Sequence, residues 1–254
     1  MSKTLAGKVA LVTGGSRGLG TATALALADQ GAHVAISYVA SAEKAAAVVA
    51  ALKAKGVRAV AIQADQGDPA ASEPLIQKVV AELGKLDILV NNAAIALQGK
   101  TIDDPAIDNA GLDRQWRVNT LGVVANIRAA VKVLPEGGRI ISVGSGLGTR
   151  VGFPGVADYA ASKAAVIGYT RGAARDIGPR NITVNVVQAG VVDTDMAADA
   201  VGSLENLPPI VMESHAIQRP AELKEVAAAI VFLAGPDAAF ITGSVLDVNG
   251  GFTA

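Results

Sequence analysis

The sequence predicts an α/β fold: a single-domain, Rossmann-like, doubly wound parallel sheet of about seven strands with helices on both faces. Two observations predict it. Short apolar runs rich in β-branched residues alternate along the chain with longer segments of helical composition, which is the order of βαβ units. No linker rich in proline or serine and no internal repeat interrupts the 254 residues, so we expect one domain over residues 1–254.

The expected elements follow one another at regular spacing. The expected strands are residues 9–13, 32–38, 57–63, 86–90, 139–143, 183–187 and 244–248. The expected helices are residues 21–30, 41–55, 69–83, 113–134, 158–177 and 222–234. Ser41 is the expected N-cap of the second helix and Asp68 that of the third. Because a helix separates most consecutive strands, we expect parallel pairing.

A glycine-rich turn follows the first expected strand. Its glycines would let the backbone turn tightly and approach a pyrophosphate, and the next helix would offer its free N–H groups. The residues expected to hold the phosphates are Gly14, Ser16, Arg17, Gly18, Leu19 and Gly20. The alternative is a tight strand-to-helix turn that binds no ligand.

Polar or glycine residues also follow several other expected strands. They lie at residues 37–38, 65–66, 91–92, 142–145 and 188–190. In an open parallel sheet, ligands bind beyond the carboxyl ends of the strands. The sequence therefore predicts that these segments meet at a nucleotide crevice.

The composition excludes several classes of function. The net charge is −1 and no basic block is present, so nucleic acid and anionic membranes are not expected partners. The chain has no cysteine, which excludes a disulfide framework, a thiolate nucleophile and a cysteine metal site. With two histidines, we expect no metal site. No apolar run approaches about 18 residues, and we expect a soluble cytoplasmic protein.

The sequence YAASK places Tyr159 and Lys163 four residues apart on one face of an expected helix. A free phenol titrates near pH ~10, too high for easy proton exchange at neutral pH. A neighbouring lysine cation and the positive ring of an oxidised nicotinamide would lower that pKa. The tyrosine could then give a proton to a carbonyl oxygen or take one from a hydroxyl. The alternative is an exposed helix face without chemistry.

Taken together, TGGSRGLG, NNAA, VNTLG and YAASK occur in the order of the classical short-chain dehydrogenase/reductase family. The chain resembles that family, and its 3-oxoacyl-carrier-protein-reductase-like and carbonyl-reductase-like members, over nearly its full length. The resemblance implies a catalytic set of Asn119, Ser145, Tyr159 and Lys163. In this set Tyr159 is the general acid/base, and Lys163 lowers its pKa and binds ribose. Ser145 orients the substrate carbonyl, and Asn119 holds a proton-relay water.

The chain departs from the family pattern at three positions. Ser145 lies one residue farther from Tyr159 than in the family, which a bulge over residues 144–148 could absorb; Ser142 is the reserve candidate. Ala94 replaces a glycine and would be strained at positive φ. Ala189 replaces a proline, which loosens the loop after the sixth strand.

The cofactor choice depends on the end of the second expected strand. NAD-preferring members carry an acidic residue there, whereas this chain has Ser37 and Tyr38. Arg17 could pair with a 2′-phosphate, so NADP(H) is favoured and NAD(H) is the alternative. By resemblance, Asp65 contacts the adenine, Asn91 the ribose side and Thr194 the carboxamide. The other expected cofactor residues are Gln66, Ala93, Gly190 and Val192, together with Tyr159 and Lys163.

The expected substrate pocket is largely apolar. Its residues are Ser145, Leu147, Phe153, Val191 and Met196. Residues 193–218 have weak periodicity and form a candidate substrate-binding lid. His215 lies in this lid, where we expect an ordinary surface histidine. Few charges stand near the site, so we expect a neutral carbonyl or alcohol as substrate.

These observations favour an NADP(H)-dependent oxidoreductase that interconverts a carbonyl and a secondary alcohol by hydride transfer. One alternative is a cofactor-binding sensor or scaffold without catalysis. A third hypothesis is an epimerase or dehydratase on the same fold. The resemblance further implies a homotetramer, or a dimer, in which residues 113–134 and 158–177 form one interface.

Overall fold

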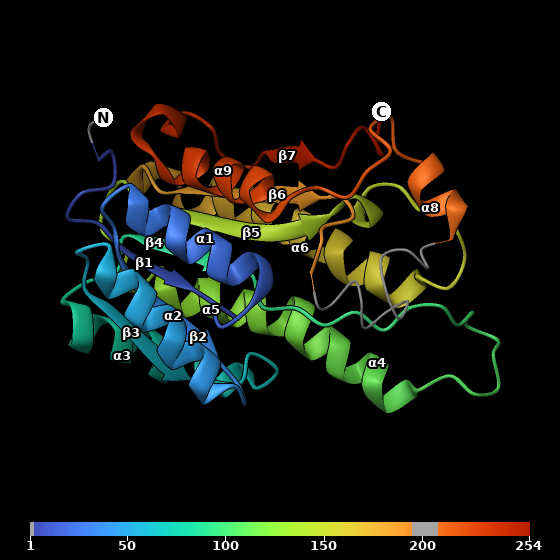
Figure 1. The fold of residues 1–254 in the computed structure, drawn as a ribbon, viewed down its shortest axis with the longest axis horizontal. Coiled ribbons are helices and arrows are strands. Elements are labelled where there is room, and N and C mark those ends of the chain that lie inside the picture. Colours follow the sequence, from blue (N-terminus) through green and yellow to red (C-terminus); the bar gives the residue numbers. More distant parts are fainter. Residues whose placement is uncertain (1–2, 195–207) are drawn as a thin grey trace.

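The computed structural model describes residues 3–194 and 208–254, and it confirms the predicted doubly wound parallel sheet (Figure 1). Seven strands pair in the order β3-β2-β1-β4-β5-β6-β7, and every pair is parallel. The strands are β1 (Val9–Val12), β2 (His33–Tyr38), β3 (Ala59–Gln63), β4 (Ile88–Asn91), β5 (Arg139–Ser145), β6 (Thr183–Ala189) and β7 (Val245–Val248). The chain reverses its direction of winding between β1 and β4, which opens a crevice at their carboxyl ends.

In the described part of the chain, three helices cover each face of the sheet. On one face lie α1 (Gly18–Asp29), α2 (Ala42–Ala54) and α9 (Leu223–Ala234). On the other face lie α3 (Ser72–Leu83), α5 (Gly122–Ala130) and α6 (Ala157–Ile177). Side chains along β1 alternate between the two cores, and all four are fully buried. Burial on both faces explains why the strands read as continuous apolar runs. Among the described residues, no helix is both long and apolar enough to cross a membrane.

The long helix predicted over residues 113–134 is instead three segments. Helix α4 (Asn109–Trp116) begins earlier, where the Asp108 side chain accepts a hydrogen bond from the Gly111 N–H at 3.0 Å. A π-helical segment, Arg117–Leu121, then leads into α5, which ends at Ala130. The Arg180 guanidinium caps this end by donating to the carbonyls of Val131 and Leu134. The three segments follow one another without a break, so the predicted helix is present with a π segment inside it and with its bounds shifted to residues 109–130.

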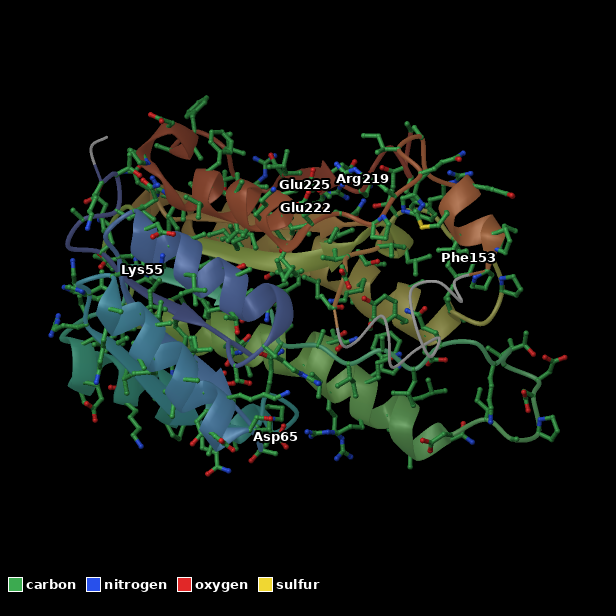
Figure 2. The ribbon with its side chains drawn as sticks, in the orientation of Figure 1. Lys55, Asp65, Phe153, Arg219, Glu222 and Glu225 are labelled. Atoms are coloured by element: carbon green, nitrogen blue, oxygen red, sulfur yellow. The ribbon has the colours of Figure 1, made fainter. Side chains whose placement is uncertain are left out.

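Two capping predictions had different outcomes. The Asp68 carboxylate accepts from the Ala70 N–H at 3.0 Å, as predicted, in a short 3₁₀ turn ahead of α3. Ser41 is the N-cap residue of α2, as predicted, but its side chain makes no capping hydrogen bond. Helix α9 has side-chain caps at its N-terminus, in the form of a capping box between Glu222 and Glu225. Arg219 donates to both Glu225 oxygens at 2.7 and 2.8 Å and lowers the pKa of that carboxyl to about 2 (Figure 2).

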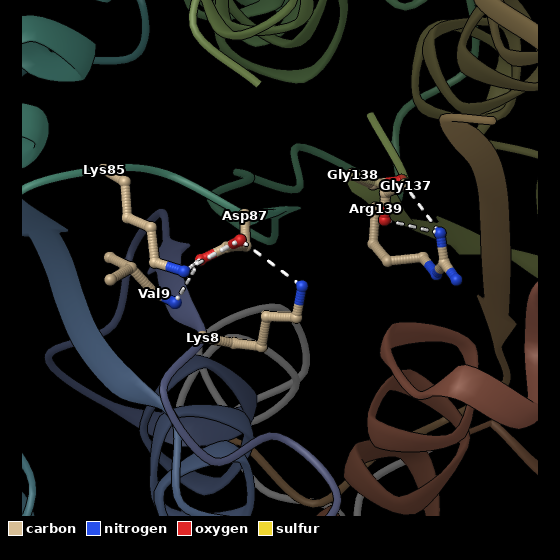
Figure 3. A network of polar contacts seen from close by, with 7 residues as sticks. All are labelled: Lys8, Val9, Lys85, Asp87, Gly137, Gly138 and Arg139. Carbon is tan, nitrogen blue, oxygen red and sulfur yellow. Dashed lines mark hydrogen bonds and ion pairs between the residues drawn. The ribbon is translucent and has the colours of Figure 1, made fainter. Parts of the chain in front are cut away.

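A buried carboxylate ties the strands together at the edge of the sheet opposite the crevice. Asp87 is 3% exposed and accepts a hydrogen bond from the Val9 N–H at 2.8 Å (Figure 3). Lys8 and Lys85 form ion pairs with it at 3.5 and 3.0 Å. Its main-chain oxygen also accepts from the N–H of Arg139, at the start of β5. Asp87 therefore links the beginnings of β1, β4 and β5.

Replacing Asp87 with alanine is expected to destabilise the protein by about 3 kcal/mol. The substitution leaves the Val9 N–H buried without an acceptor and removes a hydrogen bond to a charged group. Urea unfolding measures the loss. Asp87→Asn keeps an acceptor and is the matched control, with an expected loss of about half that size. Equal stability of Asp87→Ala and the wild type would show that the carboxylate does not stabilise this edge.

Candidate active site

A cavity of about 910 Å³ lies beyond the carboxyl ends of the strands. It extends from the turn after β1 to a short helix, α8 (Pro209–Glu213), and the C-terminal tail. Asp65, after β3, and Phe153, between β5 and α6, belong to distant parts of its wall (Figure 2). The predicted site residues that line it are Gly14, Ser16, Arg17, Gly18, Leu19, Gly20, Ser37, Tyr38, Asp65, Gln66, Ala93, Ser145, Leu147, Phe153, Tyr159, Lys163, Gly190, Val191, Val192 and Thr194. Met196 lies outside the described residues, and Asn91 and Asn119 do not line the cavity.

The glycine turn leaves no room for side chains. A Cβ on Gly20 would collide with the carbonyl oxygen of Gly14. Gly14 has a φ of +64°, a backbone conformation that favours glycine. A Cβ on Gly15 would lie 2.5 Å from Ile36. Arg17, the N-cap of α1, makes no side-chain cap, so no capping side chain covers the N–H groups of the first helical turn. Backbone N–H groups in a cradle without side chains fit the pyrophosphate of a dinucleotide.

The end of β2 supplies the next part of the wall. Ser37 is buried, and its hydroxyl accepts a hydrogen bond from the Gly14 N–H at 3.3 Å. Tyr38 is the last residue of the strand. The described part of the cavity wall at this strand end carries no carboxylate, whereas Arg17 from the glycine turn lines the same cavity. This charge arrangement suits an adenosine that carries a 2′-phosphate.

An ion pair holds the wall after β3. Arg114 of α4 donates to Asp65 at 2.6 Å, and the Gly67 N–H donates to the same carboxylate at 2.8 Å. The hydrogen bond from Arg114 holds the pKa of Asp65 below its usual value. A Cβ on Gly67 would collide with the Arg114 guanidinium. Arg114 was not predicted, because nothing near it in the sequence points to Asp65.

Buried amides form the layer beneath this wall. Gln66 donates to the carbonyls of Ala93 and Val118 at 2.7 and 2.9 Å. Asn126 of α5 donates to Gln66 and to Asn91, each at 3.2 Å. The structure thus places the Asn91 side chain in this layer rather than in the cavity. The amides join the loop after β3, the end of β4 and α5.

Tyr159 and Lys163 lie one turn apart on α6, as predicted. The Ser145 side chain lies beside the Tyr159 phenol and acts to lower its pKa. The Lys163 ammonium lies 5.7 Å from the centre of the Tyr159 ring and donates to the carbonyl of Val143 at 3.0 Å. Three functional side chains from β5 and α6 therefore meet in the cavity wall, so the exposed-face alternative for Tyr159 and Lys163 is wrong.

Burial decides the titration of both groups. It raises the pKa of Tyr159, and the hydrogen bond with Ser145 offsets only part of this shift. Burial lowers the pKa of Lys163 to about 8. For Tyr159 this direction is opposite to the predicted one, since a lowered pKa is expected from a lysine cation and an oxidised nicotinamide beside the phenol. Desolvation disfavours the phenolate more than the available hydrogen bond stabilises it.

A 3₁₀ turn, not a bulge, absorbs the extra residue between Ser145 and Tyr159. Ser145 is the last residue of β5 and its backbone is extended; the turn Gly146–Gly148 follows, and the Leu147 N–H donates to the Ser145 hydroxyl at 3.3 Å. Glycine is needed here for close packing, since a Cβ on Gly146 would lie 2.6 Å from Phe252. Ser142, the reserve candidate, is fully buried in the sheet.

Asn119 lies in the π-helical segment and is 1% exposed. Its amide accepts from the Ile95 N–H at 3.0 Å and donates to the Ile95 carbonyl at 2.9 Å. It also donates to Ser162, the neighbour of Lys163, at 3.3 Å. Asn119 thus joins the loop after β4 to α6. The strain expected at Ala94 in that loop is absent, because Asn181 is the sole described non-glycine residue with positive φ.

The substrate side of the cavity is mainly apolar. Leu147, Phe153 and Val191 line it as predicted. Sequence reasoning missed Phe252, which reaches the cavity from the C-terminal tail. It also placed His215 on the surface, whereas this side chain is 6% exposed and lines the cavity. Both residues depend on contacts between distant segments, for which the sequence carries no local signal.

Comparisons with known proteins agree with this geometry. The family described as enoyl-(acyl carrier protein) reductase matches residues 14–253. The chain belongs to the short-chain dehydrogenase/reductase family. It is accordingly an oxidoreductase of the NAD(P)-dependent class.

Relatives in this family resemble the chain over almost its full length. A short-chain dehydrogenase from Burkholderia cenocepacia, solved in complex with NADP, is 48% identical and has a TM-score of 0.91, with 99% of this chain and 100% of that one covered. A 3-oxoacyl-acyl-carrier-protein reductase of Staphylococcus aureus is 40% identical, with 96% and 97% covered. A cyclic-di-GMP-binding biofilm dispersal mediator protein of Escherichia coli is also 40% identical, with 98% of both chains covered.

Proposed function

We propose that this short-chain dehydrogenase/reductase is an NADP(H)-dependent carbonyl reductase with Tyr159 as its general acid/base. The observation that carries the proposal is the grouping of Ser145, Tyr159 and the buried ammonium of Lys163 in one part of the cavity wall. These groups share one cavity with the glycine cradle. A dinucleotide in the cradle and a carbonyl at the two hydroxyls would therefore lie in the same space.

NADP(H) is the proposed cofactor. The cradle formed by Gly14 and Gly20 fits a pyrophosphate, and Arg17 with the carboxylate-free end of β2 suits a 2′-phosphate. The relative from Burkholderia cenocepacia binds NADP in its solved structure, which supports the same choice here. When bound, the reduced cofactor supplies a hydride to the carbonyl carbon.

The side chains would divide the remaining work. Ser145 and Tyr159 would both donate hydrogen bonds to the carbonyl oxygen and fix its position. As negative charge develops on that oxygen, Tyr159 would transfer its phenolic proton to it. Lys163 would hold the ribose and stabilise the phenolate that results. Tyr159 is protonated at neutral pH, the form that reduction requires, since a phenol titrates near pH ~10 and burial raises its pKa further.

We assign proton resupply to the π-helical segment that contains Asn119. The Asn119 amide is held by Ile95 and Ser162, which fixes its side chain beside the π-helical segment. The side-chain oxygen accepts one hydrogen bond, from the Ile95 N–H, and its second lone pair could accept one from a relay water. A main-chain carbonyl of Arg117–Leu121, where the hydrogen-bond pattern departs from that of an α-helix, would be a second acceptor for the same water.

We further propose that the enzyme is a homotetramer, or a dimer, that acts in the cytoplasm. Leu121, between α4 and α5, is 51% exposed, and Phe240, before β7, is fully exposed. Apolar side chains at these two places suit contacts with other subunits. Static light scattering of the purified protein would test this assembly.

Parallel fluorescence titrations with NADPH and NADH test the cofactor assignment. We expect NADPH to bind at least about tenfold more tightly, since Arg17 would pair with the 2′-phosphate. NADPH oxidation is then measured with a panel of neutral ketones. Binding without oxidation of any ketone would favour the sensor or scaffold alternative, to which the Escherichia coli relative's name gives a precedent. Turnover without net change in the cofactor's redox state would favour an epimerase.

Replacing Tyr38 with aspartate is expected to shift the preference from NADPH toward NADH by at least about tenfold. The new carboxylate, at the end of β2, would repel a 2′-phosphate and accept a hydrogen bond from a 2′-hydroxyl. Dissociation constants from fluorescence titration measure the shift. Tyr38→Phe is the matched control and keeps the preference for NADPH. An unchanged preference in Tyr38→Asp would place the adenosine away from this strand end.

A further inference from the structure

We propose that His215 recognises a hydroxyl or N–H group of the substrate, at a position remote from the reacting carbonyl. The proposal rests on the reductase function assigned to the same cavity, and it names the class of substrate. That class is ring-bearing carbonyl compounds with a second group able to donate a hydrogen bond.

The hydrogen bonds of His215 fix its tautomer. The ring lies directly after α8 and lines the cavity while being 6% exposed. Its Nδ1 lies 2.7 Å from the carbonyl oxygen of Val211. A carbonyl only accepts, so Nδ1 carries a hydrogen. In the neutral ring, Nε2 is then an acceptor.

The Nε2 acceptor receives no hydrogen bond from any side chain or N–H group within residues 3–194 and 208–254. The ring cannot turn freely to find one. It packs against Phe252 with ring centres 5.1 Å apart, and a Cβ on Gly250 would lie 3.6 Å from its Cδ2 atom. Because the ring lines the cavity, a donor on a bound substrate can reach this acceptor.

Phe252 sets the distance between His215 and the reacting groups. The same ring abuts the turn after Ser145, since a Cβ on Gly146 would lie 2.6 Å from its Cδ1 atom. Arg150 holds the ring from a third direction, 5.4 Å from its centre, and donates to the Phe252 carbonyl at 2.6 Å. One aromatic ring thus separates His215 from the Ser145 turn. A substrate that touches both must span a similar width.

The other residues of this part of the wall are apolar, so His215 is the group that can distinguish a hydroxylated substrate from an unsubstituted one. Besides His215, the described lining residues within 153–156 and 208–252 are proline, valine, isoleucine or phenylalanine. Tyr159, Lys163 and the loop after β6 line the cavity between these two ranges. An apolar wall binds an unsubstituted ring and a hydroxylated ring alike. The selectivity therefore falls to the Nε2 acceptor.

The test compares 4-phenylbutan-2-one with its ortho-, meta- and para-hydroxyphenyl derivatives. Dissociation constants come from quenching of bound NADPH fluorescence, and kcat and KM from NADPH oxidation. His215→Asn keeps an amide near the Nδ1 position that can donate to Val211, but lacks an atom at Nε2. His215→Gln reaches the Nε2 position. Ser214→Ala is the matched control, because the Ser214 hydroxyl contacts Val211 and His215 but does not line the cavity.

In the wild type, at least one hydroxylated ketone should bind about tenfold more tightly than the parent. His215→Asn should reduce that preference below about threefold, through a higher KM for the hydroxylated ketone. His215→Gln should restore part of it, and Ser214→Ala should keep all of it. No preference in the wild type, or the same preference in His215→Asn, would overturn the proposal. Binding constants decide this even if no ketone is reduced, an outcome that would instead refute the reductase function.

Discussion

Tyr159→Phe is expected to lower kcat for ketone reduction by about a thousandfold. General acid catalysis by a positioned side chain contributes roughly 10²- to 10⁴-fold, and phenylalanine has no proton to give. The Ser145 hydroxyl would still accept its hydrogen bond from the Leu147 N–H, so the wall should keep its shape. NADPH oxidation with a ketone found in the panel measures the loss.

Two measurements separate this loss from a structural defect. The NADPH dissociation constant should change less than about twofold, because the glycine cradle lies on α1 and the turn before it. Tyr169→Phe on the same helix is the matched control, since Tyr169 packs against Arg128 away from the cavity. Near-normal turnover in Tyr159→Phe would rule out Tyr159 as the acid.

Lys163→Met is expected to abolish activity while stabilising the protein at pH 7 by about 1–2 kcal/mol. Burial lowers the pKa of Lys163 in the folded protein to about 8, from an ordinary value of 10.5, so burying the cation costs about 3 kcal/mol. Methionine avoids that cost. The variant loses the hydrogen bond to the Val143 carbonyl, which offsets about 1 kcal/mol or more of the gain.

The stabilisation should depend on pH in a defined direction. Between pH 8 and 10.5 the unfolded wild type binds the Lys163 proton and the folded one does not, so wild-type stability rises with pH. Urea unfolding at pH 7 and at pH ~9.5 should therefore show the advantage of Lys163→Met shrinking by about 2 kcal/mol. Lys78→Met, on exposed α3 surface, is the control without such a trend. A constant difference at both pH values would contradict the buried cation.

The sequence predicted the sheet well because its signal is local. Each strand end falls within two residues of its prediction, since strands buried on both faces must be apolar throughout. The glycine turn and the spacing of Tyr159 and Lys163 are also local patterns. Resemblance to the family, rather than spacing, brought Ser145 and Asn119 into the prediction.

The missed features depend on contacts between distant segments. The π segment forms where Asn119 reaches Ile95 and Ser162, which no helical period encodes. Arg114 pairs with Asp65 across 49 positions of sequence. His215 is buried only because Phe252 returns from the end of the chain to pack on it. The direction of the Tyr159 pKa shift likewise depends on how deeply the folded chain encloses the phenol.

The parallel sheet places the residues that stabilise the fold and the residues that line the cavity at opposite edges. Every strand ends at the cavity and begins at the opposite edge, where Asp87 ties β1, β4 and β5 together. Substitutions at the Asp87 edge and at the cavity share no partners, so their free-energy effects should add. Thermostabilising changes can therefore be collected at the Asp87 edge without epistasis on turnover. The chain can vary its chemistry at one edge while its tolerance to heat evolves at the other.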